Sequence, residues 1–292
     1  AEGARKKTPG PLDRREAARC LVADGELSVR RACKLAGLSR SCWYKPPEDR
    51  LARDRDVIEA LQELVEKHRR WGFWLCFQRL RNLGHKWNHK RVYRIYKELG
   101  LNHRRKTKRR VITRERQPLE VPAVPNAVWS VDFVHDTLYN GRKFRTLNVM
   151  DEGVREALDI EIDTSLPGAR LVRTMERIKS WRGLPQAIRC DNGPELVSSK
   201  FVEWCEENDV EIKYIQPGKP NQNAYIERFN RTYREEVLSS YLFDDLDEVR
   251  EITWEWMLCY NEERPHKSLG GLPPVAFREK VEAENSTLEL SG

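Results

Sequence analysis

Three prolines, at positions 118, 122 and 125, separate two halves of the chain whose hydrophobic patterns differ. Before them, apolar residues recur at helical spacing in short segments. After them, short runs rich in β-branched and aromatic residues alternate with longer helical segments. Because proline restricts φ and keeps such a stretch extended, we predict a linker here between all-α modules and an α/β domain.

The two halves also differ in charge. Residues 1–120 contain 32 Lys and Arg against 15 Asp and Glu, whereas residues 121–292 contain 21 against 31. The resulting net charges of +17 and −10 sum to the +7 of the whole chain. A basic half of this size indicates a polyanionic partner, and the alternative is a set of solvated charged faces.

Composition and cysteine spacing exclude several classes of protein. No apolar run approaches the roughly 18–20 residues of a membrane span, and the N-terminus lacks the apolar segment of a signal peptide. The seven cysteines are scattered without a C-x-x-C pair, and no histidine accompanies them at ligand spacing. We therefore expect a cytoplasmic protein with reduced thiols and no structural zinc.

Residues 1–46 have the layout of a helix-turn-helix module that binds DNA. Three short helices are expected between residues 12 and 43, with Ser28 and Ser39 as N-caps and Gly37 at the turn. A plain helical hairpin is the alternative. The candidate DNA contacts of this module are Arg30, Arg31 and Arg40.

Residues 47–102 are predicted to form a second helical DNA-binding module. Its helices are expected over 53–68, 75–83 and 88–100, and an aromatic turn at 71–74 joins the first two. The candidate phosphate contacts lie on the last of these helices: Lys90, Arg91 and Arg94.

A basic tether and a proline-spaced linker follow over residues 103–127. Residues 103–116 contain eight Lys and Arg, a density that repels itself unless a polyanion neutralises it. A nuclear-localisation-type tract is the alternative. The DNA-binding candidates here are Arg104, Arg105, Lys106, Lys108, Arg109 and Arg110.

Residues 128–262 read as a mixed α/β domain, and residues 263–292 as a C-terminal tail. The first three strands follow one another closely enough to form an antiparallel meander. The expected strands are 128–135, 144–150, 157–162, 187–190 and 211–215, and the expected helices are 168–181, 198–208, 222–240 and 245–262.

Three carboxylates stand out by their positions in this domain. Asp132 lies within the first strand, Asp191 directly follows the fourth, and Glu227 lies in a helical run. If the first and fourth strands are neighbours, Asp132 and Asp191 come close together, and a helix packed beside them can add Glu227. Three adjacent carboxylates require a cation to stay ionised, and hard oxygen ligands suit Mg²⁺ or Mn²⁺.

Two such ions can activate a hydroxyl and stabilise the leaving oxygen of a phosphodiester. The alternative is that Asp191 belongs to a plain turn and that Glu227 is a surface acid. The rival carboxylates are Asp136, Asp151 and Glu195.

Four segments resemble the catalytic core of bacterial insertion-sequence transposases: WSVDF, RCDNGPEL, QPGKPNQNAYIERFNRTYREEVL and YNEERPHKSLGGLPP. They are most similar to the downstream reading-frame product of the IS-three family, relatives of retroviral integrases. The 35 residues between Asp191 and Glu227 match the acidic-triad spacing of that family, and the resemblance runs from about Ser28 to Phe277.

The resemblance implies a ribonuclease-H-like fold, two Mg²⁺ (or Mn²⁺) ions, and catalysis and metal binding by Asp132, Asp191 and Glu227. It implies a transposase that binds the terminal inverted repeats of an insertion sequence, cleaves DNA and transfers strands to target DNA. The expected location is the bacterial nucleoid. Four residues around Glu227 are expected to face DNA: Lys219, Asn223, Asn230 and Arg231.

Because two element ends must meet, a homodimer or higher oligomer is expected, with an upstream-frame product as a further possible partner. A non-catalytic DNA-binding regulator that keeps the integrase fold is the alternative, and a stand-alone nuclease is a third reading. The chain departs from the family at the turn after Gly72, which usually carries arginines but here reads Phe73 to Cys76. The resemblance therefore does not support phosphate contacts at this turn. A second departure follows Asp151, where a Ser-Arg loop is usual and Glu152 to Arg155 stand here.

Overall fold

The computed structural model describes residues 11–23, 27–45, 50–103, 124–216 and 223–289 of the chain. The chain divides into two compact units, residues 1–60 and 61–292. This division falls within a helix, α4 (Arg50–Lys67). The predicted boundaries at residues 46 and 127 lie elsewhere in the chain. No helix of the described residues is long and apolar enough to cross a bilayer.

The first unit contains three short helices in the order expected for a helix-turn-helix. They are α1 (Pro11–Ala23), α2 (Val29–Leu35) and α3 (Arg40–Tyr44). Their small core is formed by Ala18, Cys33 and Leu38. The two expected caps differ, since the Ser39 side chain accepts a hydrogen bond from the Cys42 backbone N–H whereas the Ser28 side chain makes no capping bond.

The helices expected between 53 and 100 are confirmed with small shifts of their ends. After α4 come α5 (Phe73–Asn82) and α6 (His89–Glu98). The Asn88 side chain caps α6 by accepting a hydrogen bond from the Lys90 backbone N–H at 2.8 Å. The buried side chains of α6 are Val92, Ile95 and Tyr96, as the helical spacing predicts.

A five-stranded mixed sheet forms the centre of the second unit. Its strands are β1 (Val128–Thr137), β2 (Lys143–Asp151), β3 (Ala157–Asp163), β4 (Ala187–Cys190) and β5 (Glu211–Tyr214). The spatial order is β3-β2-β1-β4-β5, with β1, β2 and β3 antiparallel and β4 and β5 parallel to β1. The predicted meander and mixed sheet are therefore confirmed, and β1 and β4 are neighbours.

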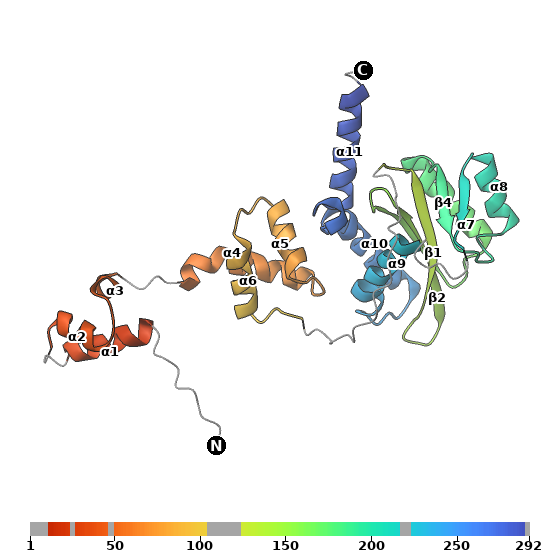
Figure 1. Cartoon of the computed structure of the whole chain (residues 1–292). Coiled ribbons are helices and arrows are strands. Elements are labelled where there is room, and N and C mark those ends of the chain that lie inside the picture. Colours follow the sequence, from red (N-terminus) through yellow and green to blue (C-terminus); the bar gives the residue numbers. More distant parts are fainter. Residues whose placement is uncertain (1–10, 24–26, 46–49, 104–123, 217–222, 290–292) are drawn as a thin grey trace. The chain divides into compact units, whose positions relative to one another are not determined.

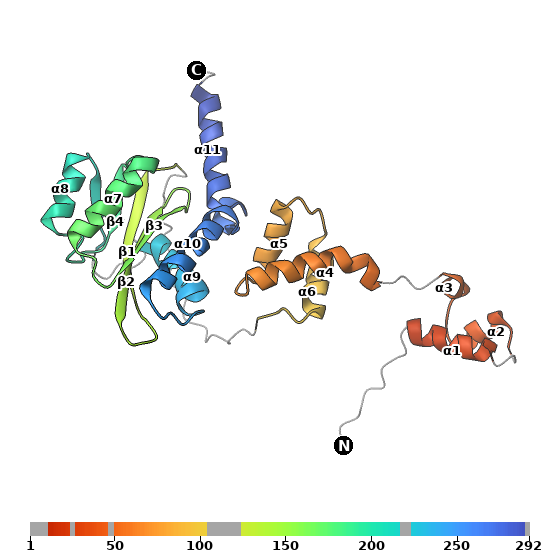
Figure 2. The ribbon, with the colours of Figure 1, turned by 180° about the vertical axis from the view of Figure 1, so that it is seen from behind.

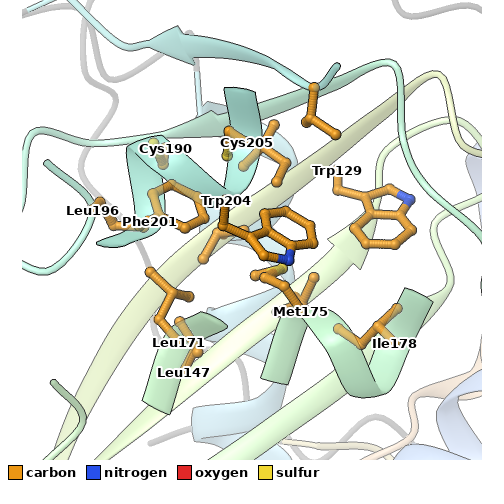
Figure 3. Close-up of a cluster of buried hydrophobic side chains, with 14 of the residues drawn as sticks. Trp129, Leu147, Leu171, Met175, Ile178, Cys190, Leu196, Phe201, Trp204 and Cys205 are labelled. Carbon is orange, nitrogen blue, oxygen red and sulfur yellow. The ribbon is translucent and has the colours of Figure 1, made fainter. Parts of the chain in front are cut away.

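Helices cover both faces of this sheet (Figures 1 and 2). On one face, α7 (Gly168–Arg182) and α8 (Ser199–Glu207) pack on a continuous apolar cluster. Figure 3 shows Trp129 of β1 with Met175 of α7 and Trp204 of α8 in that cluster. On the other face, a second cluster holds α9 (Ala224–Tyr233) and α10 (Leu246–Glu262) against the sheet.

Two C-terminal features differ from the expectation. The helix expected over 222–240 is α9 followed by a π-helical turn, Arg234–Leu238, closed by a hydrogen bond from the Ser239 N–H to the Arg234 carbonyl. This wider turn directs Val237 and Leu238 into the core. Within the segment expected as a tail, Pro274–Glu289 forms the helix α11, and proline suits the first turn of a helix.

His68 meets two residues one helical turn apart at the end of α10, Cys259 and Glu263, and together they are potential metal ligands. One ligand atom each of His68, Cys259 and Glu263 lie within 4.8 Å of one another. However, Lys67 Nζ is 2.8 Å from the Glu263 carboxylate and the Arg79 guanidinium is 3.5 Å away, so two cations already compensate it. We therefore assign this cluster to an ion-pair network. All seven cysteines lie among the described residues, and none is in a disulfide.

Candidate active site

The register of the sheet brings two of the three candidate carboxylates to one level. Ser130 of β1 pairs with Arg189 of the parallel strand β4. Asp132 and Asp191 each follow two residues later, so they lie side by side where β4 ends. Glu227 lies in the first turn of α9, which packs on β1 and β2. The strand order decides this convergence, since the two aspartates are 59 positions apart in the chain.

The electrostatics of Asp132 show that the three carboxylates share one site. The pKa of Asp132 is raised to about 6, mainly by burial and in addition by the negative charges of Asp191 and Glu227. Hydrogen bonds from the Phe133 backbone N–H, at 2.9 Å, and from Asn230 Nδ2, at 2.7 Å, oppose the shift. Asp132 therefore lies among like charges, and a bound cation would favour its ionised form.

The rival carboxylates are neutralised by arginine. Asp136 lies 3.4 Å from the Arg234 guanidinium and Asp151 lies 3.1 Å from that of Arg182. Glu195 is in an ion pair with Arg145. These three acids already have their counter-charges.

Within the described part of the chain, no lysine or arginine nitrogen lies within 4.0 Å of Asp132, Asp191 or Glu227. Three carboxylates without a described cationic partner fit Mg²⁺ or Mn²⁺. The ion pairs of the folded chain thus distinguish the three candidate metal ligands from the three rival carboxylates, a distinction that sequence position alone left open.

A chain of polar side chains orients Asp132 from the neighbouring strand. Thr146 Oγ1 donates to Asn148 Oδ1 at 2.8 Å, and Asn148 Nδ2 donates to Asn230 Oδ1 at 2.7 Å. Asn230 then uses its amide group to donate to Asp132. Asn148 and Thr146 are fully buried, and the pairing of β1 with β2 places Asn148 directly opposite Asp132.

Sequence reasoning missed Thr146 and Asn148. Their signal was two uncharged polar residues two positions apart in a strand, which places both on one face. That face proves to be the one that carries Asp132.

Asp191 is held by the turn that follows β4. The Gly193 backbone N–H donates to Asp191 Oδ1 at 2.9 Å, so the segment is both a turn and part of the site. A Cβ atom at Gly193 would lie 3.0 Å from that same oxygen. Glycine therefore permits the close approach of the backbone to the carboxylate.

The predicted DNA-binding residues fall into three groups. Arg30, Arg31, Arg40, Lys90 and Arg231 are exposed on their helices, whereas Arg91 and Arg94 are half-buried, and Arg94 contacts Glu98 at 3.0 Å. Asn230 and Asn223 turn inward: Asn230 binds Asp132, and Asn223 is only 4% exposed at the N-cap of α9. The others, Arg104, Arg105, Lys106, Lys108, Arg109, Arg110 and Lys219, lie outside the described residues.

The inward orientation of the two asparagines has a local cause. The helix expected over 222–240 would place Asn223 one turn before Glu227, on the face expected to meet DNA. The described helix begins at Ala224, so Asn223 has non-helical backbone angles and its side chain points into the protein. Asn230 lies three residues beyond Glu227, and this spacing carries it back over the sheet.

A mixed sheet that places one carboxylate within β1 and a second directly after β4 is typical of an integrase-type core. Models of the integrase core domain match residues 122–220 and 208–274, and a model of an HTH-like domain matches residues 52–110. The 39.2 kDa protein of insertion element IS476 from Xanthomonas euvesicatoria is 41% identical, over 95% of this chain and 80% of its own length. The 31.7 kDa protein of insertion element IS407 from Burkholderia multivorans is 42% identical, over 88% and 92%.

The chain belongs to this family of insertion-element proteins with an integrase core domain. Among solved structures, it is also similar to the HTLV-2 integrase catalytic core domain in complex with magnesium. That match has 19% identity and a TM-score of 0.45, and covers 54% of this chain and 99% of the viral one.

Proposed function

We propose that this protein is a DNA transposase of the IS-three family. It binds the terminal inverted repeats of its insertion sequence, cleaves DNA strands and joins them to target DNA. The observation that carries this proposal is the cluster of Asp132, Asp191 and Glu227, which no described lysine or arginine neutralises. The membership in an insertion-element family supports the same reaction.

The three carboxylates would hold two Mg²⁺ or Mn²⁺ ions, and Asn230 would keep Asp132 in position for them. Such ions supply activation of the attacking water or 3′-hydroxyl and stabilise the leaving oxygen of the phosphodiester. Asp132 is half-buried, and it keeps one carboxylate geometry because the Phe133 N–H and the Asn230 amide hold its two oxygens separately.

The helical part of the chain would hold the DNA. The match of residues 52–110 to an HTH-like domain and the +17 charge of residues 1–120 support this role. The proposed contacts are the basic residues of α2, α3 and α6 together with the basic run after residue 103. Since a reaction at two element ends needs two bound ends, we propose a homodimer or higher oligomer as the active form.

The decisive experiment incubates the purified full chain with DNA carrying the inverted repeats of its own element, with and without Mg²⁺. Sequencing of the products should reveal joined strands at the element end only when the metal is present. Binding without strand joining would instead identify a DNA-binding regulator. Cleavage of any DNA without preference for the element end would identify a general nuclease.

The basic run after residue 103 should determine the salt dependence of DNA binding. Replacing Arg104, Arg105, Lys108, Arg109 and Arg110 together by Ala should flatten the slope of log K against log salt by about 0.9 per lost phosphate contact. Fluorescence anisotropy at several salt concentrations measures this slope. The same slope in the variant and the wild-type protein would show that the run does not contact the DNA backbone.

Metal binding should weaken in acid because of Asp132. Its pKa of about 6 lies above the ordinary value of 3.8, so below about pH 6 a cation must displace a proton. We expect the apparent Mn²⁺ affinity of the DNA-free protein to fall about tenfold for each pH unit below 6 and to change little above 7. Calorimetric titration at several pH values measures it, and equal affinities across this range would contradict the prediction.

A further inference from the structure

The turn after Trp71 opens a pocket on the helical module. It has a volume of about 930 Å³ and lies between the start of α5, one face of α6 and residues 102–103. Pockets of this size accommodate small ligands or single groups of a larger one. The integrase core contributes none of its lining residues, so the pocket is separate from the candidate active site.

Aromatic rings dominate the pocket wall. Phe73 is at their centre, with ring centroids 5.1 Å from Trp74 and 4.8 Å from Tyr93, both edge-on. His89 lies nearly parallel to Trp74, at 6.2 Å. Trp74 is nevertheless 67% exposed and Tyr93 47% exposed, so large parts of their rings meet solvent.

The core of the module does not account for these exposed rings. Val92, Ile95 and Tyr96 already fill the inner face of α6, and Cys76 and Leu80 fill that of α5. Aromatic side chains left this open and grouped around one pocket mark a binding surface.

The charge around the pocket identifies its occupant as an anion with a flat apolar part. Lys90 and Arg94 line it alongside the rings, and no carboxylate is among its lining residues, although Arg94 pairs with Glu98 at 3.0 Å. From Asn102 and His103, which also line it, the chain leads directly into the basic run with its eight Lys and Arg. Aromatic rings beside cationic side chains are the combination that binds unpaired nucleotides, since bases stack on the rings and phosphates meet the cations.

We infer that this pocket binds an unpaired nucleobase of DNA, stacked on Trp74 and Tyr93 with Lys90 near the adjoining phosphate. The inference rests on the proposed function, because cleavage of one strand frees an end whose bases can leave the helical stack.

The test measures binding of a fluorescein-labelled thymidine oligonucleotide to the full chain, with a blunt duplex of the same length as reference. Both are measured in EDTA, so that no metal-dependent cleavage takes part. Stacking on one aromatic ring corresponds to a roughly 5- to 150-fold change in affinity. Trp74→Ala should therefore weaken oligonucleotide binding about tenfold and duplex binding much less, while Trp74→Phe should keep most of the affinity.

Trp181→Ala is the matched control, because Trp181 is an exposed tryptophan of α7, 55% accessible, in the integrase core. It should leave both affinities unchanged. A 2-aminopurine base within the oligonucleotide adds a direct readout, because stacking on a ring quenches its fluorescence. This quenching should disappear in Trp74→Ala. Equal melting temperatures of the variants would show that the exposed side chain is not needed for folding.

Three results would overturn the inference: unchanged oligonucleotide affinity in Trp74→Ala, equal losses for oligonucleotide and duplex, or no quenching in the wild-type protein. The last would leave the pocket as a surface for a protein. Failure of the proposed function is seen separately, as absence of strand joining in Mg²⁺ on inverted-repeat DNA. Stacking in EDTA does not depend on that outcome.

Discussion

Asp132→Asn, Asp191→Asn or Glu227→Gln should each lower strand cleavage and strand transfer by about a thousandfold or more. Each amide keeps the size of the carboxylate but removes its negative charge and leaves one oxygen for coordination, so the divalent ions lose a ligand. DNA binding should remain largely intact, because the proposed contacts lie on other side chains. Gel-based assays of end cleavage and anisotropy measurements of binding separate the two effects.

Asp136→Asn provides the matched control for these variants. Asp136 lies on the same strand as Asp132, but it is paired with Arg234 at 3.4 Å. Its variant should cleave within a few-fold of wild type. Cleavage near the wild-type rate in any one of the three triad variants would reject the assignment of the active site.

Arg182→Ala should destabilise the integrase core by about 3–5 kcal/mol. The Arg182 guanidinium lies 3.1 Å from Asp151 and 3.0 Å from Glu156, and all three side chains are at most 6% exposed. Its Nε also donates to Asn126 at 3.1 Å. Removing the Arg182 side chain leaves the buried carboxylates of Asp151 and Glu156 close together. Among the described residues, Arg278 then remains as the cation beside Glu156, whose pKa is already raised by burial.

Urea unfolding of the two proteins at neutral pH measures this loss. Lys280→Ala serves as the control, because Lys280 pairs with Glu284 at 3.7 Å on α11 with both side chains more than half exposed. An exposed pair of this kind contributes less than about 1 kcal/mol. A loss for Arg182→Ala no larger than that of the control would show that water or the neighbouring arginines compensate the two carboxylates.

This buried network also explains the departure from the family pattern after Asp151. Glu152 is fully buried and contacts Arg189 of β4 at 2.9 Å, and its carboxylate also accepts a hydrogen bond from Ser130. The segment therefore joins the ends of β1, β2 and β4 through charge pairs. The role of this segment is structural, because its carboxylates are paired with arginines. In the β1–β2 ladder, Asp151 lies opposite Trp129 and not opposite Asp132.

Local sequence signals predicted most of the secondary structure. The capping side chains of Asn88 and Ser39 mark helix starts, and runs rich in β-branched and aromatic residues mark the strands. Such signals act within a few residues, so they can be read without the fold. They failed where tertiary packing determines the local backbone. In the π-helical turn Arg234–Leu238, for example, Val237 and Leu238 pack into the core.

Residue types that could hold a cation, the 35 residues between Asp191 and Glu227 and the positive charge of residues 1–120 are all visible in the unfolded chain. Which carboxylates meet depends instead on the packing of the folded chain. Placing β4 beside β1 brings Asp132 to Asp191, and the packing of α9 adds Glu227, while arginines from other elements neutralise the rivals. Counter-charges come from anywhere in the folded chain, and for that reason no spacing in the sequence can reveal them.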